Sequence, residues 1–165
     1  MIVEANATLL EQAARLLQTI DDPTYVRPAA LFDGQRIGAH VRHVIEFYEG
    51  LFRGLRNGRV DYDARRRHPE IETERQAAIT RLSAIAAQLR ADARLRSSRM
   101  IWVAGEGSDP AESSIARELQ AICSHTVHHF ALIAVLMRYY GLPVPSDFGV
   151  SQATLKYRAA AEVAA

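Results

Sequence analysis

The sequence predicts an all-α protein, an antiparallel four-helix bundle that forms one domain over residues 1–165. Four segments repeat apolar residues at three- and four-residue intervals, which is the period of an amphipathic helix. No segment shows a convincing alternation of apolar and polar residues, which a half-buried strand would show. A chain of 165 residues also has the length of a single domain.

The first two helices are expected over residues 5–20 and 37–56. Asp21-Asp22-Pro23 should end the first, because proline lacks an amide hydrogen and disfavours helix in the residue before it. The second begins at Ile37-Gly38, and Asn57-Gly58 is a typical stop signal after it.

The third helix is expected over residues 70–94, after His68-Pro69, with acidic residues in its first turn that favour the helix dipole. The fourth is expected over residues 113–140, capped by either Asp109-Pro110 or Ser113-Ser114. Gly141 and Pro143 stop it.

The remaining segments are expected to be connections and a tail. Residues 22–36, 57–69 and 96–112 are long enough to cross the bundle, and residues 100–103 can form a short extended segment. The tail, residues 146–165, is expected to hold one more helical turn before a fraying, alanine-rich end.

Composition argues against several classes of protein. Twenty basic and nineteen acidic residues leave a net charge of +1, which gives no support for a dedicated nucleic-acid or membrane-surface protein. No run approaches the roughly 18 consecutive apolar residues of a membrane helix. Glu4 and Glu11 stand where a signal peptide would be basic, and the single Cys123 fits a reducing compartment. We therefore expect a cytoplasmic protein with no nucleic-acid or membrane partner.

Five of the six histidines lie in two short clusters, and this clustering is the main functional signal. His125 and His129 are four residues apart on the apolar face of the fourth helix, whereas His128 points toward its flank or solvent. Adjacent buried imidazoles suppress each other's protonation and are costly to bury without partners. A divalent metal accounts for both properties, because it binds neutral imidazole nitrogens and gives the buried rings a partner. The alternative is a pair of structural core histidines.

The second predicted helix can supply a third ligand. His40 and His43 are three residues apart, on adjacent turns. A helical wheel places His40 at the edge of the apolar stripe and His43 further round, beside Phe47. The wheel therefore slightly favours His40, and either residue can be the ligand. His68 and His128 are expected at the surface.

The pattern Ile37-Gly38 to His43, followed by His125-x-x-x-His129, resembles the DinB/YfiT-like superfamily of small bacterial four-helix bundles. The resemblance covers residues 5–140. It implies that His43, six residues after Ile37, is the ligand from the second helix, with His125 and His129 as the other two. It also implies a metal-dependent enzyme that either hydrolyses a small molecule or transfers a low-molecular-weight thiol to an electrophile. A homodimer formed through an apolar helix face is a further expectation.

Three protein ligands leave a coordination position open, as catalytic metal sites do. There a metal would lower the pKa of water or of a thiol. Imidazole ligands suit zinc or nickel, which we expect first, and also iron or copper. The alternative function is a non-catalytic module that binds metal for structure, sensing or a stress response. A di-iron centre is disfavoured, because it needs several inward-facing glutamates.

Two groups can assist such a site. Glu118 lies seven residues before His125 on nearly the same face, so it can orient a ligand or act as a general base. Its alternative role, which we favour, is a buried ion pair with Arg42 or Arg117. His40, where it is not a ligand, is the second candidate for either assisting role.

Three further features have plain structural interpretations. Glu46 is expected to be a solvated residue on a helix face, and Cys123 a small packing residue turned away from the histidine pair. Residues 62–68 form a basic loop that can recognise an anionic substrate. The favoured alternative is that acidic neighbours in residues 61–72 hold this loop by ion pairs.

Overall fold

The structure, a computed structural model, describes residues 1–64, 66–105 and 107–163. Within these residues the chain forms seven α-helices, two 3-10 helices and one three-stranded sheet. The prediction of an all-α, antiparallel four-helix bundle is therefore wrong as a fold class. The four expected helices are present in altered form, and a sheet covers one end of them.

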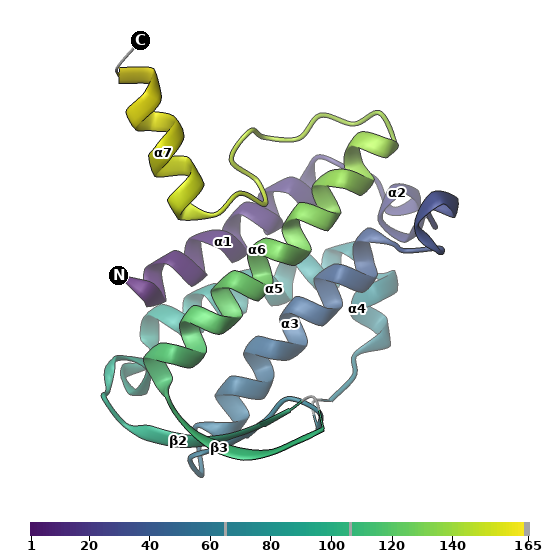
Figure 1. Cartoon of the computed structure of the whole chain (residues 1–165). Helices are drawn as coiled ribbons and strands as arrows, with labels where there is room; N and C mark the ends of the chain where they lie inside the picture. Colours follow the sequence, from purple (N-terminus) through teal and green to yellow (C-terminus); the bar gives the residue numbers. More distant parts are fainter. Residues whose placement is uncertain (65, 106, 164–165) are drawn as a thin grey trace.

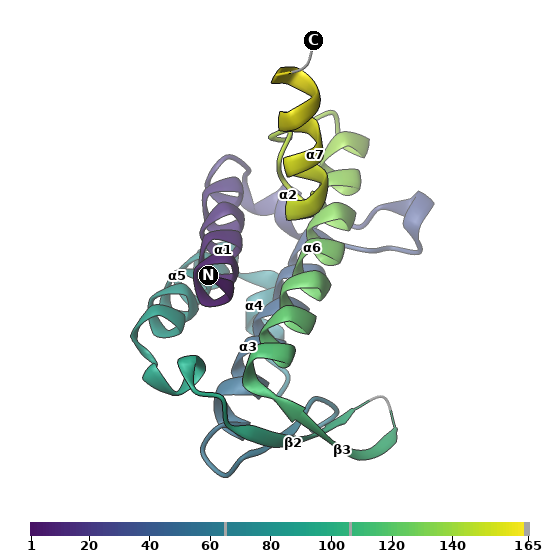
Figure 2. The same ribbon diagram turned by 60° about the vertical axis from the view of Figure 1, so that its left-hand side comes forward.

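The four long helices are α1 (Ile2–Gln18), α3 (Ile37–Gly54), α5 (Arg75–Ala91) and α6 (Ile115–Tyr139). Each packs against two of the others: α1 and α3 both contact α5 and α6. Figures 1 and 2 show the four running side by side around a shared core. The core is built from fully buried apolar side chains, among them Leu10, Ile37, Leu82 and Ile133.

The sheet consists of β1 (Arg59–Asp61), β2 (Met100–Gly105) and β3 (Ser108–Ser114), in that order, with β1 parallel and β3 antiparallel to β2. It lies at the end of the bundle where α3 ends and α6 begins (Figure 1). Val60 and Ile101 are buried, whereas Met100 and Trp102 are exposed. The strands occupy the segments expected to be crossings. The extended segment expected at residues 100–103 is part of β2. Periodicity missed the other two strands because β1 has three residues and β3 is almost wholly polar.

The third expected helix is two helices, α4 (Pro69–Thr73) and α5, separated by Glu74 in an extended conformation. In a continuous helix the Ile71 carbonyl would accept from the amide of Arg75. It accepts instead from the buried hydroxyl of Tyr25, at 2.6 Å. A Cβ at Gly38 would overlap the Glu72 carbonyl oxygen, so α4 ends directly against the start of α3. The break thus depends on contacts with distant segments.

The helix ends also differ from expectation. Asp21 follows the end of α1, as expected, and it also caps a new helix, α2 (Asp22–Val26). Its side chain accepts a hydrogen bond from the Thr24 amide at 2.9 Å. Ser114 caps α6, since its hydroxyl accepts from the Arg117 amide at 3.2 Å, while Asp109-Pro110 lies within β3.

Shorter elements fill the connections and the tail. Two 3-10 helices, η1 (Ala30–Phe32) and η2 (Ala93–Arg96), precede α3 and β2. The tail forms α7 (Gln152–Val163), much longer than the single expected turn. Figure 1 shows α7 directed away from the bundle, and most of its described residues are exposed.

By length and composition alone, α6 is the one helix among the described residues that could cross a membrane, with a mean hydropathy of 1.4 over its most apolar window. Its inner face carries buried residues such as Leu119 and Ile133 within the core. A buried core helix meets the same criterion, so this feature is weak evidence for a membrane span.

Candidate metal centre

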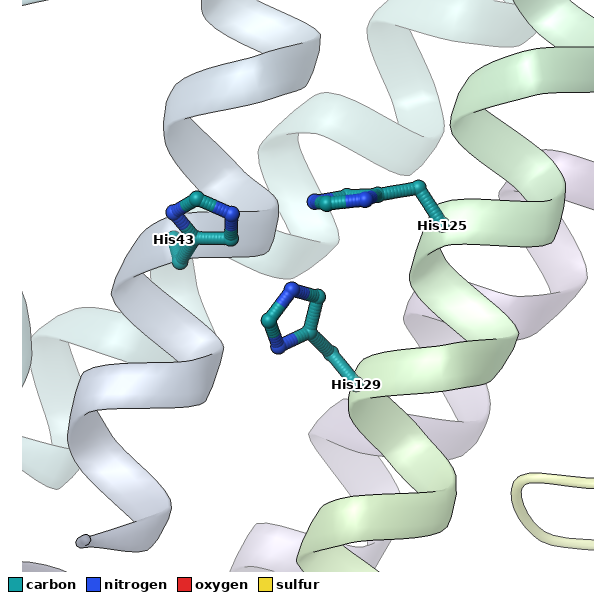
Figure 3. Close-up of side chains that lie close together, drawn as sticks. All are labelled: His43, His125 and His129. Carbon is teal, nitrogen blue, oxygen red and sulfur yellow. The ribbon is translucent and has the colours of Figure 1, made fainter.

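Three histidines converge between α3 and α6. His43 projects from α3, and His125 and His129 project from successive turns of α6 toward the same space (Figure 3). One ring nitrogen from each lies within 4.8 Å of those of the other two. The ring centroids are 4.5–5.0 Å apart. This triad can hold a metal ion.

An aromatic pair lies on one side of the triad. Phe47, one turn after His43, has its ring centroid 4.9 Å from that of His43 and 4.3 Å from that of His125. Tyr62, just after β1, stacks on Phe47 at 5.0 Å. The two rings thus cover one side of His43 and His125.

His40 lies next to the triad but outside it. Its Nδ1 is 3.0 Å from Nδ1 of His129, and its side chain is buried. The third nitrogen of the triad comes from His43. The helical wheel, which slightly favoured His40, therefore pointed to the wrong residue. His128 is exposed, as expected.

Burial favours the neutral form of two of these imidazoles, His129 and His40, because it lowers their pKa. Burial, reinforced by the neighbouring His125 and His43, lowers the pKa of His129 to about 3. Burial likewise lowers the pKa of His40, with a smaller contribution from His128. Neutral imidazole is the form that binds metal, and three imidazole nitrogens suit zinc, nickel or a similar divalent ion. The donor set therefore fits the expected metal.

A cavity of about 500 Å³ opens beside the triad. His43 and His125 form part of its wall, and Phe47 and Tyr62 form another part. The sheet side contributes Val103, Ala104 and Gly105. A second cavity of about 520 Å³, between α1 and residues 143–148, has no histidine in its lining. Of these two cavities, the first therefore gives a small molecule access to the triad.

Glu118 lines the same cavity and is buried. Its two carboxylate oxygens accept hydrogen bonds from the Tyr62 hydroxyl at 2.9 Å and from the Ser113 hydroxyl at 2.6 Å. Burial, followed by the charge of Glu118, raises the pKa of Tyr62. Of the two arginines expected to pair with Glu118, Arg42 and Arg117, the prediction is wrong for Arg42, which binds Glu46 and Glu72 instead.

Glu46 is not the solvated residue that its position suggested. It is buried, accepts from Arg42 at 2.9 Å and accepts from the backbone amide of His68 at 3.1 Å. It therefore joins α3 to the segment before α4.

His68 is also not at the surface, and the prediction that it would be is wrong. It is buried, and its two ring nitrogens lie 3.0 Å from Glu49 and 2.9 Å from Glu70. Glu70 is one of the acidic neighbours expected to hold the basic loop, whereas Glu49 lies on α3, outside residues 61–72. Arg65, part of that loop, lies outside the described residues.

Cys123 is half buried on the side of α6 that faces α1, where it lines a small cavity with Ala5 and Leu9. Burial raises the pKa of its thiol. Both observations agree with a packing residue away from the histidines.

The sequence placed Tyr62 only in a basic loop, and it did not indicate the sheet residues of the cavity wall. Phe47 was placed beside His43 on the helical wheel, but it was not predicted to line the site. Tyr62 reaches the site through the pairing of β1 with β2, which a helix period does not register.

No family model matches this chain. It is similar to a curated protein of Rhizopus delemar (strain RA 99-880) named FK506-binding protein 5, with 32% identity over 104 residues. The match takes in 59% of this chain and 27% of that protein, so the chain spans about a quarter of the relative's length. A match of that extent shows no shared family.

Proposed function

We propose that this protein is a metal-dependent enzyme that holds one divalent ion with His43, His125 and His129 and acts on a small molecule, by hydrolysis or by transfer of a low-molecular-weight thiol. The observation that carries the proposal is the convergence of three imidazoles beside a cavity of about 500 Å³. The resemblance to the DinB/YfiT-like superfamily agrees with this reading of the site.

The bound ion would supply Lewis acidity, which lowers the pKa of a water or thiol nucleophile and polarises the bond under attack. The histidines would fix the ion at one end of the cavity. Phe47 and Tyr62 would hold an apolar part of the substrate and exclude water.

Glu118 is the group in the described cavity wall that we assign to proton transfer. Its carboxylate accepts two hydroxyl hydrogen bonds, which fix its orientation, and each oxygen retains a further lone pair. It can therefore take up the proton of the nucleophile and later return it to the leaving group.

Metal binding is tested first, by elemental analysis of the purified protein and titration with zinc and with nickel. We expect about one ion per chain in the wild type, none in His129→Ala and one in His128→Ala. His128 is a matched control because it is the neighbouring histidine on α6 but is exposed. Equal loss in the two variants, or no stoichiometric binding in the wild type, would contradict the proposal.

Catalysis is tested next, with metal-loaded protein against thiols plus a panel of electrophiles and against model amides and esters. Turnover should fall by about 10²- to 10⁴-fold in Glu118→Gln while the metal stays bound. A wild type that binds metal but turns over none of these would favour the alternative, a non-catalytic metal-binding or sensing module.

A further inference from the structure

The contact between His40 and His129 restricts where the protons of both rings can lie. Their Nδ1 atoms are 3.0 Å apart, within hydrogen-bonding distance. A hydrogen bond between two imidazole nitrogens needs one N–H donor and one lone-pair acceptor. One of the two Nδ1 atoms therefore carries the proton between them, and the other accepts it.

The orientation of His129 decides which ring is the donor once a metal is bound. In Figure 3 one nitrogen of the His129 ring points into the space between His43 and His125. Because Nδ1 is engaged with His40, the nitrogen facing that space is Nε2. A neutral imidazole that binds a metal through Nε2 has its proton on Nδ1.

We propose that His40 is a positioning residue that accepts the Nδ1–H of His129 and so fixes the tautomer and ring orientation in which Nε2 of His129 faces the metal. This inference rests on the proposed function, in which His129 is a ligand. The Nδ1 of His40 would then be unprotonated and its own proton would sit on Nε2.

The surroundings of His40 suit this role. Its side chain is buried, so water competes little for the hydrogen bond. The same ring borders a cavity of about 260 Å³ lined by Phe32, Gln35 and Leu136 among others, which leaves room for side chains of other shapes. Ligand histidines in proteins generally donate their second N–H to an acceptor, and loss of that acceptor typically weakens metal binding by about 10- to 100-fold.

The first test is zinc affinity, measured by competition with a chelator in the wild type, His40→Leu, His40→Gln and His128→Ala. We expect His40→Leu to bind about 10- to 100-fold more weakly. His40→Gln should recover part of that loss, because its amide oxygen can accept the same N–H, and His128→Ala should match the wild type. Wild-type affinity in His40→Leu overturns the inference alone, whereas a wild type that binds no zinc overturns the proposed function as well.

The second test does not require a variant to fold. Nitrogen-15 NMR of the zinc-loaded wild type, with histidine side chains labelled, reports which ring nitrogens carry protons. We expect a proton on Nδ1 of His129 and on Nε2 of His40. A proton on Nδ1 of His40, or metal at Nδ1 of His129, overturns the inference.

Discussion

The pairs α1–α5 and α3–α6 are both packed helix pairs, but they bury different chemistry. Between α1 and α5 the buried side chains are apolar, such as Leu10 and Leu82, and the charged groups stay at the rim. Between α3 and α6 the packing encloses imidazoles, with His40 buried and the triad half buried.

This difference separates stability from function. Apolar burial contributes roughly 25 cal/mol per Å² removed from water. Imidazole burial costs free energy unless each nitrogen finds a partner. We infer that the α1–α5 contact contributes more than the α3–α6 contact to the stability of the metal-free fold. The α3–α6 contact reaches its full stabilising contribution only when a metal is bound.

The largest expected loss of stability is in the helix pair α1–α5, whose buried side chains are apolar. Leu82→Ala should lower the free energy of unfolding by about 2–5 kcal/mol, because it leaves a cavity in a fully buried position. Denaturant unfolding measures this loss, with Gln88→Ala, at an exposed position on the same helix, as the control. Zinc affinity should not change. A loss of stability no larger than that of the control would contradict the proposed division.

The second largest effect is expected in the helix pair α3–α6, which encloses the histidines. Zinc at 100 times its Kd should stabilise the wild type by about 2.7 kcal/mol, because it binds the folded state. Chelation should reverse this gain, which thermal unfolding would record. Leu82→Ala should keep the gain and His129→Ala should lose it. A similar gain in His129→Ala would mean that zinc binds elsewhere.

The histidine face was predictable from sequence because helical period alone determines it. Four-residue spacing placed His125 and His129 together and turned His128 outward, and the structure agrees. The wheel could not choose correctly between His40 and His43. It located the apolar edge of the helix, and burial at that edge is not the same as convergence with α6.

The pairing of the strands into a sheet and the break in the third helix were not predictable, because both depend on contacts between segments far apart in sequence. Val60 packs so closely on Gly54 that a Cβ there would overlap it, and Tyr25 takes the carbonyl that would have continued α4. The same dependence hid the burial of His68, whose partners include Glu49 on α3.

A third, smaller effect is expected where the two pairs meet. The buried Tyr48 hydroxyl on α3 donates to Oδ1 of Asn6 on α1 at 2.7 Å and lies 3.2 Å from the Thr126 hydroxyl on α6. Tyr48→Phe leaves Asn6 Oδ1 without this donor and should cost about 1–3 kcal/mol. Tyr157→Phe, at an exposed position, is the control for thermal unfolding. No difference between the two would mean that the network does not couple the helix pairs.

The smallest effect is expected at the rim of the apolar pair, where Arg90 on α5 binds Glu4, at 2.7 Å, and Glu11 on α1. Hydrogen bonds from Arg90 hold the pKa of both carboxyls below the ordinary value of 4.5. On acidification the unfolded chain therefore takes up these protons first. The contribution of these ion pairs to stability is complete above pH 4.5 and is lost as the pH falls through the lowered folded-state pKa values.

Because the cluster is exposed, Arg90→Met should lower the melting temperature only slightly at neutral pH, and the difference should vanish in acid or at high salt. A difference that persists in acid would mean that the aliphatic stem of Arg90, rather than its charge, joins α5 to α1.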